Sequence, residues 1–313
     1  MPNHKVLIAD SLAESGKQIL LAETELDDRA GISPEELLEV IPAYNALIVR
    51  GRTKVTREVI EAGKNLAVVG RAGVGVDNID LAAAQASNVI VVNSPTATTT
   101  AVVEHTFALL LSMLRRIPQA DATMKTGQWE KKALQGAELY GKTLGIIGMG
   151  RIGAQVGQVA AGFGMTILGY DPLIPADTIL QRGAEPVSLH DLYARADVIS
   201  LHLPLNNETR NMIDGEALSA MKRGVYLVCA ARGGIIDETA LLARLDSGQV
   251  AGAALDVFAQ EPPGLTALVA HPLVTAAPHI GAQTQEAQER ASQHIAEEII
   301  RALKGEKLFW QVV

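Results

Sequence analysis

The segment KTLGIIGMGRIGAQVGQVAAGFGMTILGYDP, residues 142–172, decides the fold of this chain. Its first apolar run, TLGII, has the length and composition of a buried β-strand, and the run TILGY near its end has the same character. Between them, Gly148, Gly150 and Gly153 stand at the spacing G-x-G-x-x-G and open a stretch with helical character. The order strand, glycines, helix, strand predicts a βαβ unit of a parallel sheet.

Each glycine of this motif has a physical task. Gly148 permits a tight turn, Gly150 lets the backbone approach a pyrophosphate group, and Gly153 allows the helix to pack closely on the strand. The amino terminus of the helix, at Arg151 and Ile152, then faces the negative charge of the phosphates. We therefore predict a dinucleotide site. The alternatives are that the glycines only shape a tight turn and that Arg151 is a solvated side chain.

Asp171 ends the second strand of this unit, 18 residues past Gly153. A carboxylate at this place can accept hydrogen bonds from the hydroxyls of an adenosine ribose. A 2′-phosphate would meet the same negative charge at close range. The predicted cofactor is therefore NAD rather than NADP.

Short apolar runs alternate with amphipathic stretches on both sides of this segment. KVLIA, ALIVR, LAVVG and VIVVN come before it, and DVISLH, VYLVCA, VAGAALDV and LVTAAP come after it. Continuous apolar strands separated by helices are typical of parallel sheets that are covered on both faces. The predicted fold class is α/β, with two doubly wound parallel-sheet domains of the Rossmann or flavodoxin-like type. A length of 313 residues suits two such domains.

Two segments are placed to carry the chain between these domains. The stretch SPTATTTAVVEHTFALLLSML contains a break and then a predicted long helix over Val102–Leu114. Near the end of the chain, a loop leads into a terminal helix that should stop at Gly305. We predict a discontinuous first domain, residues 1–97 plus 284–313, and a second domain over residues 98–283.

The composition argues against several classes of protein. A formal net charge of −8 offers no basic surface for nucleic acid, whose binding depends on clustered Lys and Arg. No apolar run approaches the length that crosses a membrane, and MPNHKVLIAD lacks the apolar core of a signal peptide. Cys229 is the only cysteine, so no intrachain disulfide can form, which fits a reducing compartment. We expect a soluble cytoplasmic protein without nucleic-acid or membrane partners.

Three polar residues follow apolar strands in the carboxyl half of the chain. Arg232 comes after YLVCAA, Glu261 after AALDVFAQ, and His279 after LVTAAP. Open α/β sheets bind their ligands at these strand ends. A guanidinium can hold a carboxylate through two hydrogen bonds, an imidazole can exchange a proton, and a carboxylate can orient that imidazole. Together, the three residues predict a hydride-transfer site beside the nicotinamide.

Each of these residues also has a structural explanation on its own. Arg232 could pair with Asp237, Glu261 could cap the loop EPPG, and His279 could be a turn residue after Pro278. The histidines that look less promising as catalytic groups are His105, His190, His202, His271 and His294. No group of residues has metal-ligand spacing, and GMGRIG lacks the Gly-Lys-Ser/Thr ending of an NTPase loop. We therefore predict neither a metal site nor NTP hydrolysis.

The chain resembles the D-2-hydroxyacid dehydrogenase family, and within it the D-3-phosphoglycerate dehydrogenases. The agreement runs in order through RGRTKVT, VVGRAGVGVDNID, GKTLGIIGMGRIG, GYDP, CAARGGIIDE, GAALDVFAQEPP and PHIGAQTQEAQ. The resemblance implies a substrate domain from the amino-terminal segment plus the terminal helix, an NAD-binding domain between them, and a cleft where the two meet. It also implies a homodimer or homotetramer that uses the long helix with FALLLSMLRR.

The resemblance further implies roles for particular residues. Arg232 would bind the substrate carboxylate, His279 would exchange the hydroxyl proton, and Glu261 would support the histidine. The loop whose backbone N–H groups would hold the same carboxylate comprises Gly73, Val74 and Gly75. The remaining residues that match the cofactor site are Asp171, Thr209, Ala230, Asp256 and Gly281.

Two departures from the phosphoglycerate dehydrogenase pattern concern the phosphate group. Many relatives have Arg-Ser or similar where this chain has Arg50 and Gly51, and an Asn-Gly-Asn-like turn where residues 96–98 are Thr-Ala-Thr. Arg50, Arg52 and Lys54 still offer positive charge to a phosphate, unless they form only a solvated basic loop. The chain ends at KLFWQVV, without the serine-binding domains of longer relatives, so feedback by serine is not expected.

The resemblance implies that the protein oxidises D-3-phosphoglycerate to 3-phosphohydroxypyruvate with NAD, the first step of serine biosynthesis. A glyoxylate or hydroxypyruvate reductase is the nearest alternative, because it needs the same catalytic groups but no phosphate contact. A protein that senses NAD(H) without turnover, like a corepressor, is a distant alternative.

Overall fold

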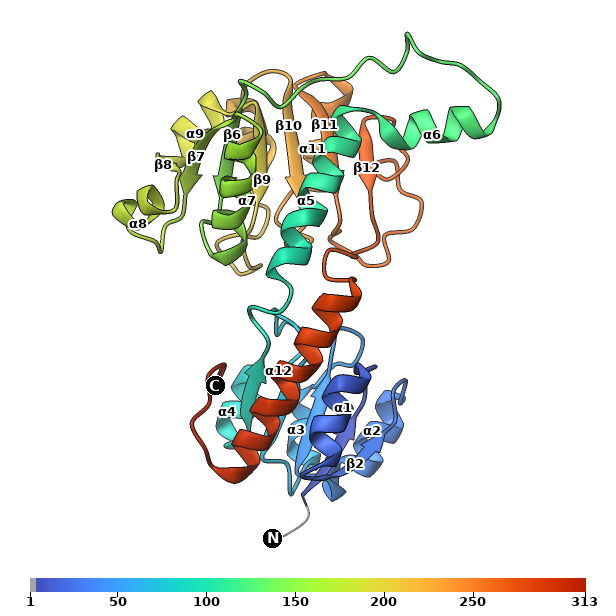
Figure 1. Ribbon diagram of the computed structural model, residues 1–313, viewed down its shortest axis with the longest axis vertical. Helices are drawn as coiled ribbons and strands as arrows, with labels where there is room; N and C mark the ends of the chain where they lie inside the picture. The colour runs from blue at the N-terminus through green and yellow to red at the C-terminus, as the bar shows by residue number, and fades with distance from the viewer. Residues whose placement is uncertain (1–3) are drawn as a thin grey trace. The chain divides into compact units, whose positions relative to one another are not determined.

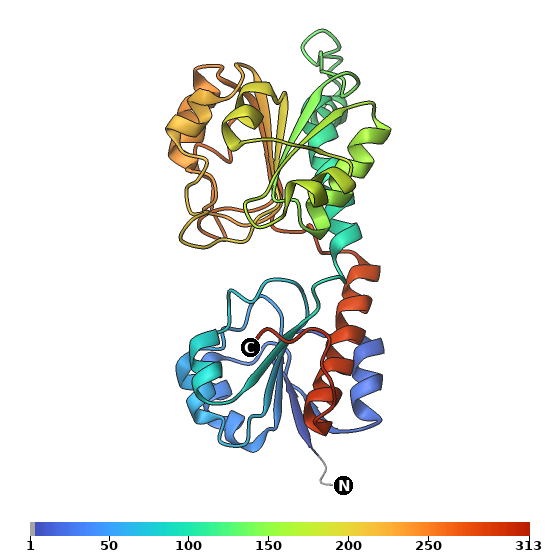
Figure 2. The same ribbon diagram turned by 90° about the vertical axis from the view of Figure 1, so that its left-hand side faces the viewer.

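A computed structural model describes residues 4–313 and divides the chain into two α/β units (Figure 1). The first unit contains the chain up to Thr100 together with Ala282–Val313, and the second contains Ala101–Gly281. Each unit has one parallel sheet, with five strands in the first and seven in the second. Helices cover both faces of each sheet (Figure 2). The predicted fold class is confirmed.

The sheet of the first unit has the strand order β2-β1-β3-β4-β5. Its strands are β1 (Lys5–Ile8), β2 (Glu25–Asp28), β3 (Ala46–Val49), β4 (Val68–Arg71) and β5 (Ile90–Asn93). One face carries α1 (Glu14–Leu21) and α12 (Gln285–Lys304), and the other carries α2 (Pro34–Val40), η1 (Ile41–Ala43), α3 (Arg57–Ala62) and α4 (Leu81–Ala86). Side chains alternate along a strand, so Leu47 and Ile48 enter the two different cores.

The sheet of the second unit has the strand order β12-β11-β10-β9-β6-β7-β8. Its strands are β6 (Thr143–Ile147), β7 (Thr166–Tyr170), β8 (Glu185–Pro186), β9 (Val198–Leu201), β10 (Val225–Cys229), β11 (Val250–Leu255) and β12 (Val274–Ala276). One core includes α5 (Thr99–Leu114), α7 (Arg151–Gly162) and α8 (Ala176–Gln181), and the other includes α9 (Leu189–Arg195), α10 (Gly215–Ala220) and α11 (Glu238–Asp246). The chain winds outward in opposite directions from β6 and β9, and such a switch point is where open α/β sheets bind ligands.

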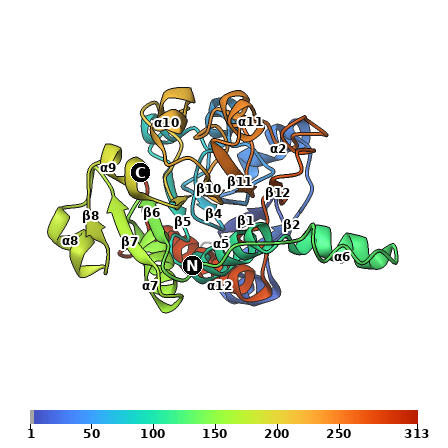
Figure 3. The same cartoon turned by 90° about the horizontal axis from the view of Figure 1, so that it is seen from above.

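The helix signals in the sequence correspond to helices in the structure. The predicted helix over Val102–Leu114 lies within α5, and α12 ends at Gly305, whose φ of 69° is the left-handed conformation of a helix cap. The apolar run of α5 is buried in the core of the second unit rather than exposed for a partner. The next helix, α6 (Ile117–Lys125), has no buried residues and extends away from the sheet of its unit (Figure 3).

None of the helices between residues 4 and 313 combines the length and the apolar character that crossing a bilayer requires.

Candidate active site

The glycine motif forms the turn from β6 to α7. Gly148 has φ of 97°, a left-handed backbone that favours glycine, and its N–H donates to the carbonyl of Tyr170 at 2.8 Å. Gly153 packs against this turn, since a Cβ atom there would lie 2.0 Å from the carbonyl oxygen of Gly148. Gly150 is the N-cap of α7, and a Cβ atom there would meet no atom within 4 Å. The backbone of Gly150 therefore faces open space at a helix amino terminus, which fits the pyrophosphate of NAD.

Asp171 follows β7 and anchors the glycine turn. Its Oδ2 accepts the N–H of Met149 at 2.9 Å, and its Oδ1 accepts the N–H of Leu173 at 2.9 Å. Each carboxylate oxygen keeps a second lone pair, so ribose hydroxyls can still donate to Asp171. Arg151 is exposed at the first position of α7, and Ile152 after it is half-buried.

Arg232, Glu261 and His279 follow β10, β11 and β12, which are neighbours in the sheet. The carboxyl ends of parallel strands meet at one edge of a sheet, so the three residues belong to the same edge. The loops that follow β10 and β11 also pack directly on each other, because a Cβ atom at Gly233 would lie 1.8 Å from the carbonyl oxygen of Phe258. The structure thus brings the three predicted residues to one edge of the second unit.

His279 and Glu261 form a direct pair. Nδ1 of His279 lies 2.8 Å from Oε2 of Glu261, and Oε1 of Glu261 accepts the N–H of Phe258 at 3.1 Å. The carboxylate favours the tautomer with the proton on Nδ1 and leaves Nε2 as an acceptor. The two side chains are 49% and 36% exposed, so a ligand can reach the imidazole. This arrangement can take a proton from a bound hydroxyl group.

Arg232 is half-buried, and its Nη1 donates to the preceding carbonyl oxygen at 2.7 Å. Its own carbonyl oxygen lies 3.7 Å from Sγ of Cys229. Burial raises the pKa of the Cys229 thiol to about 11, so this group stays protonated and unreactive. Asp237, the alternative partner for Arg232, caps α11 through hydrogen bonds from two backbone N–H groups to Oδ1.

Asp256 is a buried carboxylate after β11 and is 1% exposed. Its Oδ1 accepts the N–H of Ile280 at 2.9 Å, its Oδ2 accepts the N–H of Gly281 at 2.8 Å, and Nε2 of His105 lies 3.1 Å from Oδ1. Burial alone would raise the pKa of Asp256, but His105 and the two N–H groups outweigh it and hold the pKa below its ordinary value. His105, which the sequence places among the less promising histidines, thus contacts a residue of the predicted cofactor set.

Two other residues of that set lie in segments that follow strands of the same sheet. Thr209 follows β9, where its hydroxyl donates to the carbonyl of Pro204 at 2.7 Å and accepts the N–H of Asn206 at 2.9 Å. The hydroxyl proton of Thr209 is therefore used within its own loop. Ala230 follows β10 and is half-buried against the core.

His202 also follows β9, next to the glycine turn. Its Nε2 lies 2.8 Å from Oγ of Ser200, and its carbonyl oxygen would be 2.4 Å from a Cβ atom at Gly148. Burial lowers the pKa of His202 to about 4, so the imidazole is neutral at physiological pH. The turn that is predicted to face the cofactor phosphates therefore has an uncharged neighbour.

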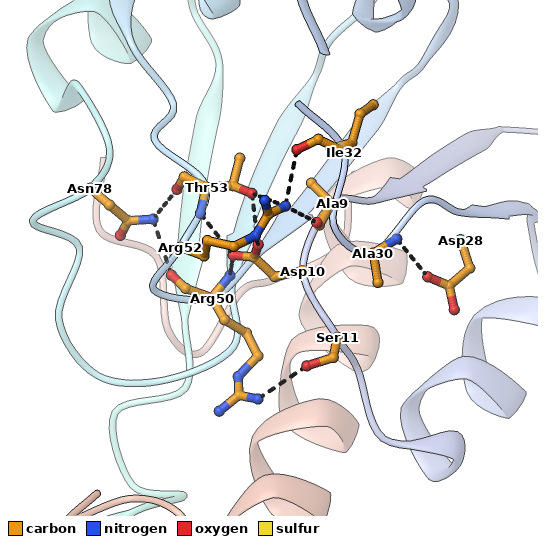
Figure 4. Close-up of polar contacts among 10 residues, drawn as sticks. All are labelled: Ala9, Asp10, Ser11, Asp28, Ala30, Ile32, Arg50, Arg52, Thr53 and Asn78. Atoms are coloured by element: carbon orange, nitrogen blue, oxygen red, sulfur yellow. Dashed lines mark hydrogen bonds and ion pairs between the residues drawn. The ribbon is translucent and has the colours of Figure 1, made fainter. Parts of the chain in front are cut away.

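In the first unit, a buried carboxylate shapes the loop that follows β3 (Figure 4). Oδ2 of Asp10 accepts the N–H groups of Arg50 and Thr53 at 2.7 and 3.1 Å, and Oδ1 accepts the hydroxyl of Thr53 at 2.7 Å. From the other side, Nδ2 of Asn78 donates to the carbonyls of Arg50 and Thr53 at 3.0 and 2.7 Å. The loop is thus held by both its N–H and its carbonyl groups.

The two arginines of this loop have different surroundings (Figure 4). Nη2 of Arg52 donates to the carbonyls of Ala9 and Ile32 at 3.2 and 3.0 Å. These hydrogen bonds tie the guanidinium of Arg52 to the backbone of its own unit. The guanidinium of Arg50 extends the other way and makes one long hydrogen bond, 3.4 Å from Nη1 to Oγ of Ser11. Burial lowers the pKa of Arg50 and the charge of Asp10 acts in the opposite direction, but the group stays cationic at neutral pH.

The loop after β4 contains the predicted Gly73, Val74 and Gly75. The N–H of Gly73 donates to the carbonyl of Arg71 at 2.8 Å, and the carbonyl of Val74 accepts Nδ2 of Asn93 at 2.6 Å. A Cβ atom at Gly73 would lie 1.6 Å from Nη1 of Arg71, so this guanidinium lies directly against the loop. Arg71 is a cation at the predicted anion site that the sequence analysis missed, although its place at the end of a strand was the available signal.

Over residues 4–313, no three His, Cys, Asp or Glu side chains gather closely enough to hold a metal ion.

Comparison with known proteins gives a consistent result. Residues 107–281 match the family model described as D-isomer specific 2-hydroxyacid dehydrogenase, NAD binding domain. D-3-phosphoglycerate dehydrogenase 2, chloroplastic, from Arabidopsis thaliana is 48% identical over 308 residues, or 98% of this chain and 49% of that protein. D-3-phosphoglycerate dehydrogenase from Methanocaldococcus jannaschii is 48% identical over 303 residues, or 96% of this chain and 58% of that protein. The chain therefore spans about half the length of these curated relatives.

A solved structure of a glyoxylate reductase from Paecilomyes thermophila is 33% identical to this chain with a TM-score of 0.92. The match covers 100% of this chain and 99% of the reductase.

Proposed function

Because the chain belongs to the family of D-isomer specific 2-hydroxyacid dehydrogenases and carries its NAD-binding domain, we propose that it oxidises D-3-phosphoglycerate to 3-phosphohydroxypyruvate, the first step of serine biosynthesis. The relatives with 48% identity over nearly the whole chain support this substrate. The observation that carries the chemistry is the contact of 2.8 Å between His279 and Glu261 at the carboxyl edge of the sheet.

The reaction breaks the C2–H and O–H bonds of the substrate and leaves a carbonyl group. NAD, when bound, accepts the hydride from C2. Nε2 of His279 takes the hydroxyl proton, and Glu261 stabilises the imidazolium that forms. Arg232 holds the substrate carboxylate with its planar fork. In the first unit, we assign the N–H groups of residues 74 and 75 to the binding of an anionic group of the substrate.

We assign the substrate phosphate to Arg50. Its guanidinium is half-buried and has one hydrogen bond of 3.4 Å, whereas Arg52 is bonded to two backbone carbonyls. A phosphate oxygen would give Arg50 the charge-assisted partner that Ser11 supplies only weakly. Removing one such hydrogen bond costs about 1.5–3 kcal/mol, or about 10- to 100-fold in kcat/KM.

The test compares D-3-phosphoglycerate with D-glycerate by NADH absorbance, using wild type, Arg50→Ala and the control Arg57→Ala. Arg57 is an exposed arginine of the same unit that forms ion pairs with Glu61 and Asp80. We expect Arg50→Ala to lose about 10- to 100-fold in kcat/KM on the phosphorylated substrate alone. Equal loss on both substrates, or no loss, would overturn the phosphate assignment.

Glyoxylate or hydroxypyruvate reduction is the second candidate, favoured by the likeness to the glyoxylate reductase. This reaction uses Arg232, Glu261 and His279 in the same roles and needs no phosphate contact. Faster turnover of glyoxylate or hydroxypyruvate than of the phosphorylated acid would establish it. Tight NADH binding without turnover of any 2-hydroxy acid would instead support a sensor.

We also propose that the enzyme is a cytoplasmic homodimer or homotetramer that acts on small molecules and binds neither nucleic acid nor membranes. The support for an oligomer is the exposed apolar surface of α6 and the segment after it, where Ile117, Met124 and Trp129 are 53%, 55% and 76% exposed. Light scattering coupled to size exclusion tests this, and Trp129→Ser should weaken the assembly. A wild-type mass equal to one chain would contradict it.

A further inference from the structure

The backbone of His279 has a conformation that its surroundings must hold. Its φ is 54°, in the left-handed region that a residue with a Cβ atom rarely adopts. Conformations of this kind persist only where neighbouring groups fix them. Glu261 contacts the ring through Nδ1, so another group must hold the backbone.

Asp256 supplies three acceptors to the three consecutive N–H groups that begin at His279. Its carbonyl oxygen accepts the N–H of His279 at 2.8 Å, Oδ1 accepts that of Ile280 at 2.9 Å, and Oδ2 accepts that of Gly281 at 2.8 Å. The N–H of Asp256 donates to the carbonyl of Cys229 at 2.9 Å, which ties this clamp to the end of β10. A carboxylate binds N–H groups more strongly than a neutral acceptor does.

His105 is the counterpart of this buried charge on α5. Its Nε2 lies 3.1 Å from Oδ1 of Asp256, and its side chain is 16% exposed. The ring nitrogen does not meet hydrogen-bond geometry, so the contact is electrostatic. Gly281 makes the approach possible, because a Cβ atom there would lie 3.0 Å from Oδ2 of Asp256 and 3.4 Å from Cδ2 of His105.

We infer that Asp256 and His105 form a positioning pair for His279, an inference that rests on the proposed role of His279 as proton acceptor. Glu261 orients the imidazole ring, Asp256 fixes the backbone that carries it, and His105 compensates the buried charge of Asp256. His105 therefore acts on His279 through Asp256 and does not touch the substrate. The rival role for Asp256 is a direct contact with the cofactor.

Hydrogen exchange of the protein without cofactor separates these roles, because it needs no catalysis. We compare wild type, Asp256→Asn, His105→Leu and His105→Gln by mass spectrometry of peptides that cover residues 277–284. The control is Asp246→Asn, which removes the carboxylate of another His–Asp contact in the same unit, 3.5 Å from His271. Peptides from β11 report whether each variant is folded.

We expect exchange at residues 279–281 to become about 10- to 100-fold faster in Asp256→Asn and about 3- to 10-fold faster in His105→Leu. His105→Gln, which cannot carry a positive charge, should lose protection as His105→Leu does, and the control should match wild type. The kcat of Asp256→Asn should fall about 10- to 100-fold while the Kd for NADH stays within about twofold. In the Asp256→Asn background, His105→Leu should speed exchange at residues 279–281 by less than about a further twofold, because His105 acts through Asp256.

Wild-type exchange at residues 279–281 in Asp256→Asn or His105→Leu would overturn the inference. So would a Kd for NADH raised more than about tenfold in Asp256→Asn with those amides still protected, since that is the signature of a cofactor contact. A wild-type protein that oxidises no 2-hydroxy acid would defeat the proposed function, whereas the exchange result would still decide whether Asp256 holds His279.

Discussion

The glycine motif allows two alanine substitutions with opposite consequences. In Gly150→Ala, the new Cβ atom has no neighbour within 4 Å, so we expect the free energy of unfolding to change by about 0.5 kcal/mol or less. The methyl group would occupy the space where a pyrophosphate approaches the backbone at the start of α7. Loss of one or two charge-assisted hydrogen bonds, at about 1.5–3 kcal/mol each, should weaken NADH binding by about 10- to 10⁴-fold.

In Gly153→Ala, the Cβ atom would lie 2.0 Å from the carbonyl oxygen of Gly148, where ordinary contact begins at 3.4 Å. The helix or the turn must therefore move by 1.4 Å, which is 3.4 minus 2.0. Overpacking of this kind costs about 1–3 kcal/mol. The melting temperature should fall by about 2–4 °C for each kcal/mol in a domain of this size.

Thermal unfolding measured by calorimetry and NADH titration measured by fluorescence separate the two effects. Gly162→Ala is the control, because Gly162 lies at the end of the same helix and a Cβ atom there meets nothing within 4 Å. Gly150→Ala should be stable and defective in binding, and Gly153→Ala should be unstable. Wild-type NADH affinity in Gly150→Ala would refute the assignment of this turn to the cofactor, and wild-type stability in Gly153→Ala would refute the packing argument.

Three further predictions concern the second unit. His279→Gln should lower kcat about 10²- to 10⁴-fold, and turnover at the wild-type rate in a steady-state assay would remove His279 from the mechanism. Gly233→Ala, whose Cβ atom would stand 1.8 Å from the carbonyl oxygen of Phe258, should push two loops of the site apart and lower kcat/KM about tenfold or more; unchanged kinetics would contradict this. Burial lowers the pKa of His202 from 6.5 to about 4, so the unfolded chain binds more protons between these values and stability falls as the pH is lowered, by about 3 kcal/mol at most. His202→Asn should flatten this slope in urea unfolding from pH 7 to pH 4, and an unchanged slope would show that another group causes it.

The sequence by itself determined the parallel sheets and the place of the dinucleotide turn. Buried strands of a parallel sheet are continuous apolar runs, and the glycine spacing has a local steric cause, so both are visible in short windows of sequence. Arg232, Glu261 and His279 could be selected for the same reason, because each follows such a run. Edge strands leave a weaker signal: β2 has the sequence ELDD, and β8 has two residues.

Only the tertiary structure decided which partner each polar side chain has. Arg50 and Arg52 lie in one basic loop and cannot be told apart by sequence, yet the guanidinium of Arg52 bonds to backbone carbonyls and that of Arg50 to the hydroxyl of Ser11. His105 meets Asp256 across a separation of 151 residues, with no motif that joins them. Such contacts arise when a helix and a strand end pack together, and a pairing of this kind has no period or spacing along the chain from which it could be predicted.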